Sequence, residues 1–184
     1  MRKSCISVQT ISDLYSTVES PEVSDKRAMK STLKVGLLNA NSISSHEQEC
    51  LSFFEKHKLD LMFIQDARIS MSKQVNTQLF NNSYVSGHII RKTDPYLTQV
   101  VLHKRNLSLN ILPCAQQECV VIELSPAETG RATTTIVSAY ARPQDPVAIV
   151  NIREALKDLK EDTQIVLMGD LNAKFPEHGS RSVT

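Results

Sequence analysis

Short apolar runs alternate with turn-forming residues along the chain from Leu33 onward. Runs of this kind, separated by Asn, Asp, Ser, Pro and Gly, are typical of β-strands joined by turns. Pairs such as Ser125-Pro126 and Thr129-Gly130 supply turn signals between the middle runs. We therefore predict strands at residues 33–38, 61–64, 100–102, 120–124, 135–139 and 165–168.

Two segments show the periodicity of an amphipathic helix instead. The first is predicted over residues 44–58, because Ser44 and Glu47 have the spacing of a capping box. The second is predicted over residues 145–161, because Asp145 is a cap residue followed by proline in the first turn. The expected apolar faces consist of Cys50, Leu51, Phe53 and Phe54 in the first helix and Ile149, Ile152, Leu156 and Leu159 in the second.

The order of these elements predicts the fold class. Strand, helix, strand, several strands, helix and strand describe an α/β domain whose helices pack outside the sheets. The consecutive strands in the middle cannot all be joined by helical crossovers, so part of the sheet structure is expected to be antiparallel. A plain doubly wound parallel sheet is therefore disfavoured.

The first part of the chain lacks this organisation. Residues 1–31 are rich in serine and mixed in charge, with Pro21 and no sustained apolar period, so we predict a disordered polar leader there. The single folded domain is expected over residues 32–184, a length that suits one hydrophobic core.

Composition and charge exclude several classes of protein. A formal net charge of +1, from 21 basic and 20 acidic residues, argues against a protein that holds nucleic acid by overall charge, so such contacts must be local. The 4 cysteines are too few and too irregular for a disulfide scaffold or a zinc site. No membrane span or signal peptide core is present, so we expect a soluble protein of the cytoplasm or nucleus with no membrane partner.

Polar side chains follow four of the predicted strands. Asn39, Asp66, Tyr140 and Asp170 each come directly after an apolar run. Ligand groups gather at the carboxyl ends of strands in α/β proteins, so these side chains are candidates for one shared site. Carboxylate and amide oxygens suit magnesium, and a phosphate oxygen readily completes its coordination shell. Each position alone can also be a turn or capping residue, and that interpretation stays open.

The same motifs resemble a known family. Asn39-Ala40-Asn41, residues 60–66, Ala139-Tyr140 and residues 169–173 resemble, in order, motifs of the endonuclease/exonuclease/phosphatase superfamily. The stretch from Gly169 looks most like the endonuclease domain of non-LTR retrotransposon polyproteins, in which a reverse transcriptase follows. The resemblance implies a DNase I-like four-layer sandwich of two mixed sheets flanked by helices. It also implies hydrolysis of a DNA phosphodiester with Mg²⁺ or Mn²⁺ and no small-molecule cofactor.

The resemblance assigns roles to particular residues. Asp66 falls at the metal-binding position of the family, with Asn39 beside the metal. Asp170 is the catalytic residue that activates water, while Asn172 and Tyr140 contact the phosphate. Three cations next to these motifs are candidates for nucleic-acid binding: Arg68, Arg142 and Lys174.

Two departures from the family pattern bear on activity. The chain contains no Asp-His segment of the kind that ends family members, so we expect an incomplete sandwich and an enzyme that is inactive by itself. Asp66 stands where the family has Glu, and the loss of one methylene retracts the carboxylate by roughly 1.5 Å, which weakens the fit to magnesium. Two alternatives stay open: a catalytically dead module that binds nucleic acid or phosphate, and a phosphatase for a small phosphate ester. The oligomeric state is left open.

Overall fold

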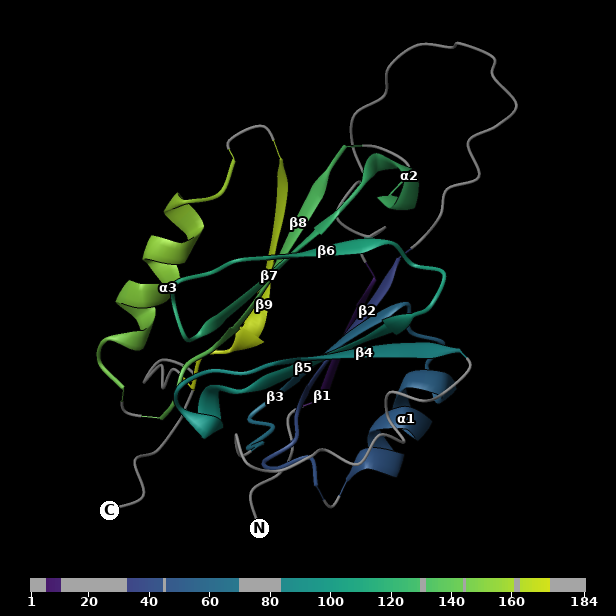
Figure 1. The fold of residues 1–184 in the computed structure, drawn as a ribbon, viewed down its shortest axis with the longest axis horizontal. Helices are drawn as coiled ribbons and strands as arrows, with labels where there is room; N and C mark the ends of the chain where they lie inside the picture. The colour runs from purple at the N-terminus through teal and green to yellow at the C-terminus, as the bar shows by residue number, and fades with distance from the viewer. Residues whose placement is uncertain are drawn as a thin grey trace, which may run out of the picture.

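Two β-sheets face each other in the centre of the molecule (Figure 1). The computed structural model describes residues 6–10, 33–44, 46–69, 84–129, 132–143, 145–160 and 163–172. The first sheet has the order β1-β2-β3-β5-β4 and the second the order β6-β7-β8-β9. The strands of the first sheet are β1 (Ile6–Thr10), β2 (Lys34–Asn39), β3 (Leu61–Gln65), β4 (Val85–Ile90) and β5 (Gln99–Lys104). Those of the second are β6 (Leu109–Leu112), β7 (Cys119–Leu124), β8 (Thr134–Tyr140) and β9 (Gln164–Asp170).

Each sheet contains one parallel pair, and that pair positions the site. Strands β2 and β3 run parallel, with Asn39 opposite Gln65. Strands β8 and β9 also run parallel, with Tyr140 opposite Asp170. The other neighbours in both sheets are antiparallel, as the run of consecutive strands in the sequence predicts.

Alternation along the strands divides the core into layers. Leu37 and Phe63 of the first sheet pack against Ile136 and other residues of the second, which fills the space between the sheets. Their chain neighbours Leu38 and Ile64 point to the opposite face, because successive side chains of a strand alternate.

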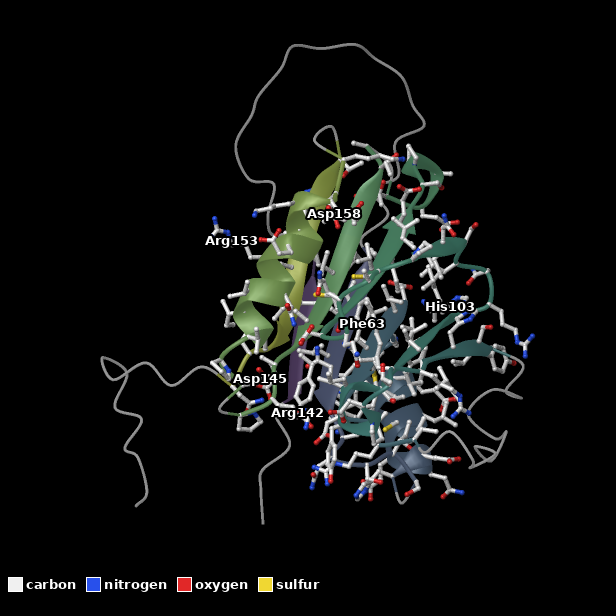
Figure 2. The ribbon with its side chains drawn as sticks, turned by 60° about the vertical axis from the view of Figure 1, so that its left-hand side comes forward. Phe63, His103, Arg142, Asp145, Arg153 and Asp158 are labelled. Atoms are coloured by element: carbon white, nitrogen blue, oxygen red, sulfur yellow. The ribbon has the colours of Figure 1, made fainter. Side chains whose placement is uncertain are left out.

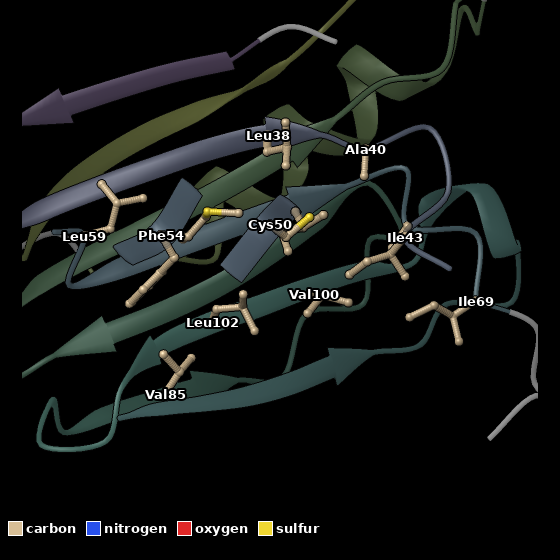
Figure 3. Close-up of a cluster of buried hydrophobic side chains, with 13 residues drawn as sticks. Leu38, Ala40, Ile43, Cys50, Phe54, Leu59, Ile69, Val85, Val100 and Leu102 are labelled. Atoms are coloured by element: carbon tan, nitrogen blue, oxygen red, sulfur yellow. The ribbon is translucent and has the colours of Figure 1, made fainter. Parts of the chain in front are cut away.

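Helices cover the two outer faces. Helix α1 (Glu47–Lys56) places Cys50 and Phe54 on the first sheet, in the cluster that Figure 3 shows. Helix α3 (Ala148–Lys157) packs on the second sheet through Ala148, Ile152 and Ala155. The predicted four-layer α/β sandwich is therefore confirmed. Two short helical segments complete the described elements: η3 (Pro95–Leu97) and α2 (Pro126–Thr129).

The starts of both long helices differ from the prediction. His46, not Ser44, occupies the N-cap position of α1 and makes no capping hydrogen bond through its side chain. The hydroxyl of Ser44 instead lies 3.1 Å from that of Ser42. Helix α3 begins at Ala148, because Oδ1 of Asp145 accepts a hydrogen bond from the Val147 amide and forms a turn before the helix.

The apolar face of α3 also differs from the prediction. Ile149 is 51% exposed, while Ala148 and Ala155 are buried with Ile152. Leu156 and Leu159 are only partly buried against the same cluster. Small alanines form the contact because they allow the helix to approach the second sheet closely.

Part of the predicted leader belongs to the first sheet. Ile6–Thr10 forms β1 and pairs antiparallel with β2. The remainder of residues 1–31 lies outside the described residues, and the domain boundary near residue 32 stays a prediction. Within the described part of the chain, no helix is long and apolar enough to cross a membrane.

Candidate active site

The ends of the two parallel strand pairs meet at one edge of the sandwich. Nδ2 of Asn39, at the end of β2, donates a hydrogen bond of 3.0 Å to Oδ2 of Asp170, at the end of β9. These residues are 131 positions apart in the chain, so the contact forms only when the two sheets are stacked. Tyr140 lies opposite Asp170 in the parallel register and is 4% exposed. Asn39, Tyr140 and Asp170 are thus brought together, as the sequence predicts.

The Asp170 carboxylate is held by two hydrogen bonds. Oδ2 accepts from Asn39, and Oδ1 accepts from the Asn172 amide at 3.0 Å. The Asp170 amide donates to Oε1 of Gln65 at 3.1 Å. Both the backbone and the carboxylate of Asp170 are therefore oriented by other residues of the site.

Asn172 is turned back toward the protein. Its φ of 46° lies in the left-handed region, which asparagine tolerates better than most residues. Its Nδ2 donates a hydrogen bond of 2.7 Å to the Ala141 carbonyl. This bond uses one of the two N–H groups of a side chain that is predicted to donate to a phosphate, and the other N–H group remains for that role.

A buried polar network lies beneath the site and joins the two sheets. Nε2 of Gln65 donates to Oγ of Ser138 and to the Ala139 carbonyl, both at 2.9 Å. Oγ of Ser138 donates to Oε1 of Gln99 at 2.7 Å, and Nε2 of Gln99 donates to the Glu118 carbonyl at 3.2 Å. An unpaired buried polar group costs about 1–3 kcal/mol, so this series of hydrogen bonds fixes the relative position of the sheets.

Sequence reasoning did not assign a role to this network. Gln65 is completely buried at the end of the apolar strand Leu61–Gln65. A polar side chain that directly ends a fully apolar run is the signal that could have pointed to it. Ser138 and Gln99 carry no comparable signal, because serine and glutamine are common in surface strands and turns.

The Tyr140 hydroxyl keeps its proton. Burial raises its pKa to about 12, and the negative charges of Asp66 and Asp170 act in the same direction. A hydrogen bond with Asn39 and the positive charge of Arg68 oppose this rise only in part. Tyr140 is therefore a hydrogen-bond donor at neutral pH.

Asp66 is paired with a cation from its own loop. Nε and Nη2 of Arg68 donate to Oδ1 and Oδ2 of Asp66, both at 2.9 Å. This bidentate bond raises the pKa of Arg68, and Asp66 is 4% exposed. Both residues have φ near 50°, which folds the loop so that their side chains meet.

This arrangement does not fit a divalent cation. The side chains near the site include the oxygen donors that magnesium prefers, but both carboxylate oxygens of Asp66 already accept from Arg68. The amide of Asn39 directs Nδ2 at Asp170, and its Oδ1 accepts from the Asn41 amide at 3.2 Å. Among the described residues, no three His, Cys, Asp or Glu side chains converge on one point.

The aromatic ring of Tyr96, in η3, contacts two of the three candidate nucleic-acid-binding cations, Arg68 and Arg142. The guanidinium carbon of Arg68 lies 4.8 Å from the ring centroid, and that of Arg142 lies 5.5 Å from it. Arg142 also forms an ion pair with Asp94. Arg68 and Arg142 are thus placed beside the site, while Lys174 lies outside the described residues.

Comparisons with solved structures identify the fold. The human Nocturnin catalytic domain with bound sulfate superimposes with a TM-score of 0.56, at 13% identity over 77% of this chain and 64% of that one. The endonuclease domain of TRAS1, a telomere-specific non-LTR retrotransposon, gives 0.53 at 16% identity over 78% and 61%. The AP endonuclease LMAP from Leishmania major gives 0.55 at 16% identity over 73% and 53%.

These likenesses show that the chain has the endonuclease/exonuclease/phosphatase fold, which confirms the fold that the resemblance implies. The chain spans less than two thirds of the length of each of these three structures. No family model and no curated protein matches the sequence.

Proposed function

We propose that the chain is a nuclease-type hydrolase that binds a DNA phosphodiester at the edge where Asn39 and Asp170 meet. The observation that carries the proposal is their hydrogen bond of 3.0 Å, which joins the ends of parallel strands from two different sheets. Two of the three structures described above are named as endonucleases, which supports a nucleic acid as the substrate. The likeness to the TRAS1 domain supports an origin in a retrotransposon-like element.

Each residue of the site has a separate role in the proposed reaction. Asp170 has a fixed carboxylate that accepts a proton from the attacking water, as a general base does. Tyr140 and the second N–H of Asn172 donate hydrogen bonds to phosphate oxygens. Arg68 supplies positive charge against the phosphate. Preorganised donors and one cation stabilise the charge that develops during attack on a phosphodiester.

The role of Mg²⁺ or Mn²⁺ is a separate part of the proposal. The donor atoms have the right chemistry, but an ion reaches Asp66 only when Arg68 leaves that carboxylate. Binding of the phosphodiester and dependence on a cation are therefore tested independently.

The test is nicking of supercoiled plasmid by the purified chain, with Mg²⁺, with Mn²⁺ and with EDTA. Asp170→Asn preserves the shape of the side chain and removes the base, so nicking is expected to fall by at least about a hundredfold. Asp158→Asn is the matched control, because Asp158 is exposed at the opposite end of α3 from Arg142 (Figure 2). Equal nicking by both variants would contradict the role of Asp170.

A second candidate is a binding module without turnover. The observation that favours it is the Asp66–Arg68 ion pair, which neutralises the carboxylate expected to hold the metal. Plasmid binding without nicking supports this module, whereas turnover of p-nitrophenyl phosphate alone supports a phosphatase.

A further inference from the structure

A polar cavity lies beside the candidate active site. It has a volume of about 680 Å³ and is bounded by the η3 turn, the turn before β7 and the start of the β8–α3 connection. Its wall includes Tyr96, Glu118, Arg142 and Asn151. Figure 2 shows Arg142 and Asp145, two of its lining residues, near the N-terminal end of α3.

Tyr96 connects this cavity with the site. It lines the cavity, and its ring centroid lies 4.8 Å from the guanidinium carbon of Arg68 and 5.5 Å from that of Arg142. Arg68 bonds Asp66 on the side of the site, and Arg142 lines the cavity. The cavity is therefore adjacent to the site, within reach of the next unit of a polymer bound there.

The cavity wall contains a buried acceptor and a buried donor that lack partners. Glu118 is 5% exposed, and its Oε1 accepts from Nδ2 of Asn151 at 2.9 Å, but its Oε2 has no hydrogen-bond partner. Nε of Arg142 is also buried without a partner, although this side chain pairs with Asp94. Buried polar groups are normally hydrogen-bonded, so a ligand with both a donor and an acceptor would complete the hydrogen bonding of these two groups.

Glu118 is fixed relative to the site by its own backbone. Its carbonyl accepts from the Tyr140 amide at 2.9 Å and from Nε2 of Gln99 at 3.2 Å. The cavity therefore keeps a constant distance from the phosphate-binding edge, as required for a subsite that reads the next unit of a polymer.

We propose that this cavity binds the nucleobase next to the phosphate held at Asn39 and Asp170, and that it prefers cytosine or adenine to thymine. The inference rests on the proposed function. Cytosine and adenine place an amino group next to an unprotonated ring nitrogen on their Watson–Crick edge. The amino group donates to Oε2 of Glu118, the ring nitrogen accepts from Nε of Arg142, and the base stacks on Tyr96.

Thymine has the opposite pattern on the same edge. Its O4 carbonyl faces the Glu118 carboxylate, so one acceptor faces another. Its N3–H faces the Arg142 guanidinium, so one donor faces another. One well-placed pair of hydrogen bonds distinguishes bases by about 1–3 kcal/mol, which corresponds to at least about a fivefold difference in affinity.

The test is fluorescence anisotropy of the full chain with labelled single-stranded (dC)12, (dA)12 and (dT)12 in EDTA. We expect (dC)12 and (dA)12 to bind at least about fivefold more tightly than (dT)12. In Glu118→Gln the side chain keeps its shape but gains an amide that donates to O4 of thymine, so the preference is expected to disappear or reverse. Glu123→Gln changes a half-buried glutamate of β7 that does not line the cavity, so it is the control and retains the preference.

A second variant keeps the inference testable if Glu118→Gln fails to fold. Tyr96 is 44% exposed, so Tyr96→Leu leaves the core intact while it removes the stacking surface. We expect the affinity for all three oligonucleotides to fall by at least about fivefold. Unchanged affinities in this variant overturn the subsite.

The outcomes separate this inference from the proposed function. If the unaltered chain binds all three oligonucleotides equally, or if Glu118→Gln keeps the original preference, the base subsite is wrong while phosphodiester binding stands. If none of the three binds, the proposed function and the subsite both fail.

Discussion

At the scale of single residues, the pairing of Asp66 with Arg68 decides the charge of the candidate site. The sequence placed Asp66 among metal ligands and Arg68 among nucleic-acid contacts, since spacing alone gives no information about their contact. The loop conformation brings the two side chains within 2.9 Å of each other. The guanidinium therefore occupies the carboxylate that the metal was expected to use.

Removal of Arg68 is expected to create a cation site. Two unit charges about 4 Å apart interact by about 4 kcal/mol at an effective dielectric constant of 20, so the guanidinium strongly opposes an ion at Asp66. In Arg68→Gln we expect Mn²⁺ to bind at least about tenfold more tightly, as measured by isothermal titration calorimetry. Arg153→Gln, on the exposed face of α3, is the control and leaves the affinity unchanged. Equal Mn²⁺ affinity in Arg68→Gln and the unaltered chain would show that the ion pair does not exclude the cation.

Tyr140 is expected to make the stability of the folded chain depend on pH in the alkaline range. Its pKa is raised to about 12 in the folded chain from an ordinary value of 10.0. Between these two pH values the unfolded chain loses the proton and the folded chain keeps it, so stability falls as the pH rises through this window. Urea denaturation at pH values from 9 to 12 measures the loss, and Tyr140→Phe is expected to show a smaller decline. An identical decline in both chains would assign the effect to other groups.

At the scale of secondary structure elements, the central strands were predicted from the sequence, whereas three of the four edge strands were not; the exception is β9, whose apolar run at residues 165–168 revealed it. β3 and β8 are buried along their full length, and their apolar runs gave their positions within one or two residues. The strands that the sequence analysis missed are β1, β4 and β6, and each lies at an edge of its sheet. The side chains of β4 and β6 are mostly half-buried, so they need no continuous apolar run.

The convergence of the site was also predictable, from the apolar runs of β2, β8 and β9. Asn39, Tyr140 and Asp170 lie at the ends of parallel neighbours, and the rule that such ends carry ligand groups located them. The contacts of each side chain could not be predicted from the sequence, because they depend on the φ values of the loop residues. Asn172 and Arg68 turn toward their observed partners through left-handed backbone conformations.

Gly169 allows β9 to lie against β8. A Cβ atom added there meets the Ala139 carbonyl and backbone, which cannot move without breaking the ladder between the two strands. We expect Gly169→Ala to lower the free energy of unfolding by about 3 kcal/mol or more, measured by urea denaturation. Gly36→Ala is the comparison, because its Cβ meets only the flexible side chains of Leu59 and Met62, and we expect about 1 kcal/mol. A larger loss in Gly36→Ala than in Gly169→Ala would contradict this explanation.

At the scale of the whole molecule, the two sheets are joined by polar as well as apolar contacts. Gln65 of the first sheet bonds Ser138, the Ala139 carbonyl and the Asp170 amide of the second. These bonds set the position of one sheet relative to the other, whereas the apolar layer between them tolerates small shifts.

Loss of Gln65 is therefore expected to affect both stability and the site. Gln65→Leu leaves several buried groups unpaired, and we expect the free energy of unfolding to fall by about 2–4 kcal/mol in urea denaturation. Thr135→Val is the control, because Thr135 is also buried but makes only a long contact of 3.5 Å with Thr163. A loss in Gln65→Leu no greater than that in Thr135→Val would indicate that the network adds little.

Each sheet is formed by a continuous stretch of the described chain, β1 to β5 for the first and β6 to β9 for the second. Asn39 and Asp66 belong to the earlier stretch, and Tyr140 and Asp170 to the later one. Under the proposed function, neither stretch by itself contains all the residues of the phosphate-binding site. If the chain were divided between Lys104 and Leu109, each fragment alone would be unable to bind nucleic acid. Binding by a mixture of the two fragments would therefore show that the two sheets had reassembled.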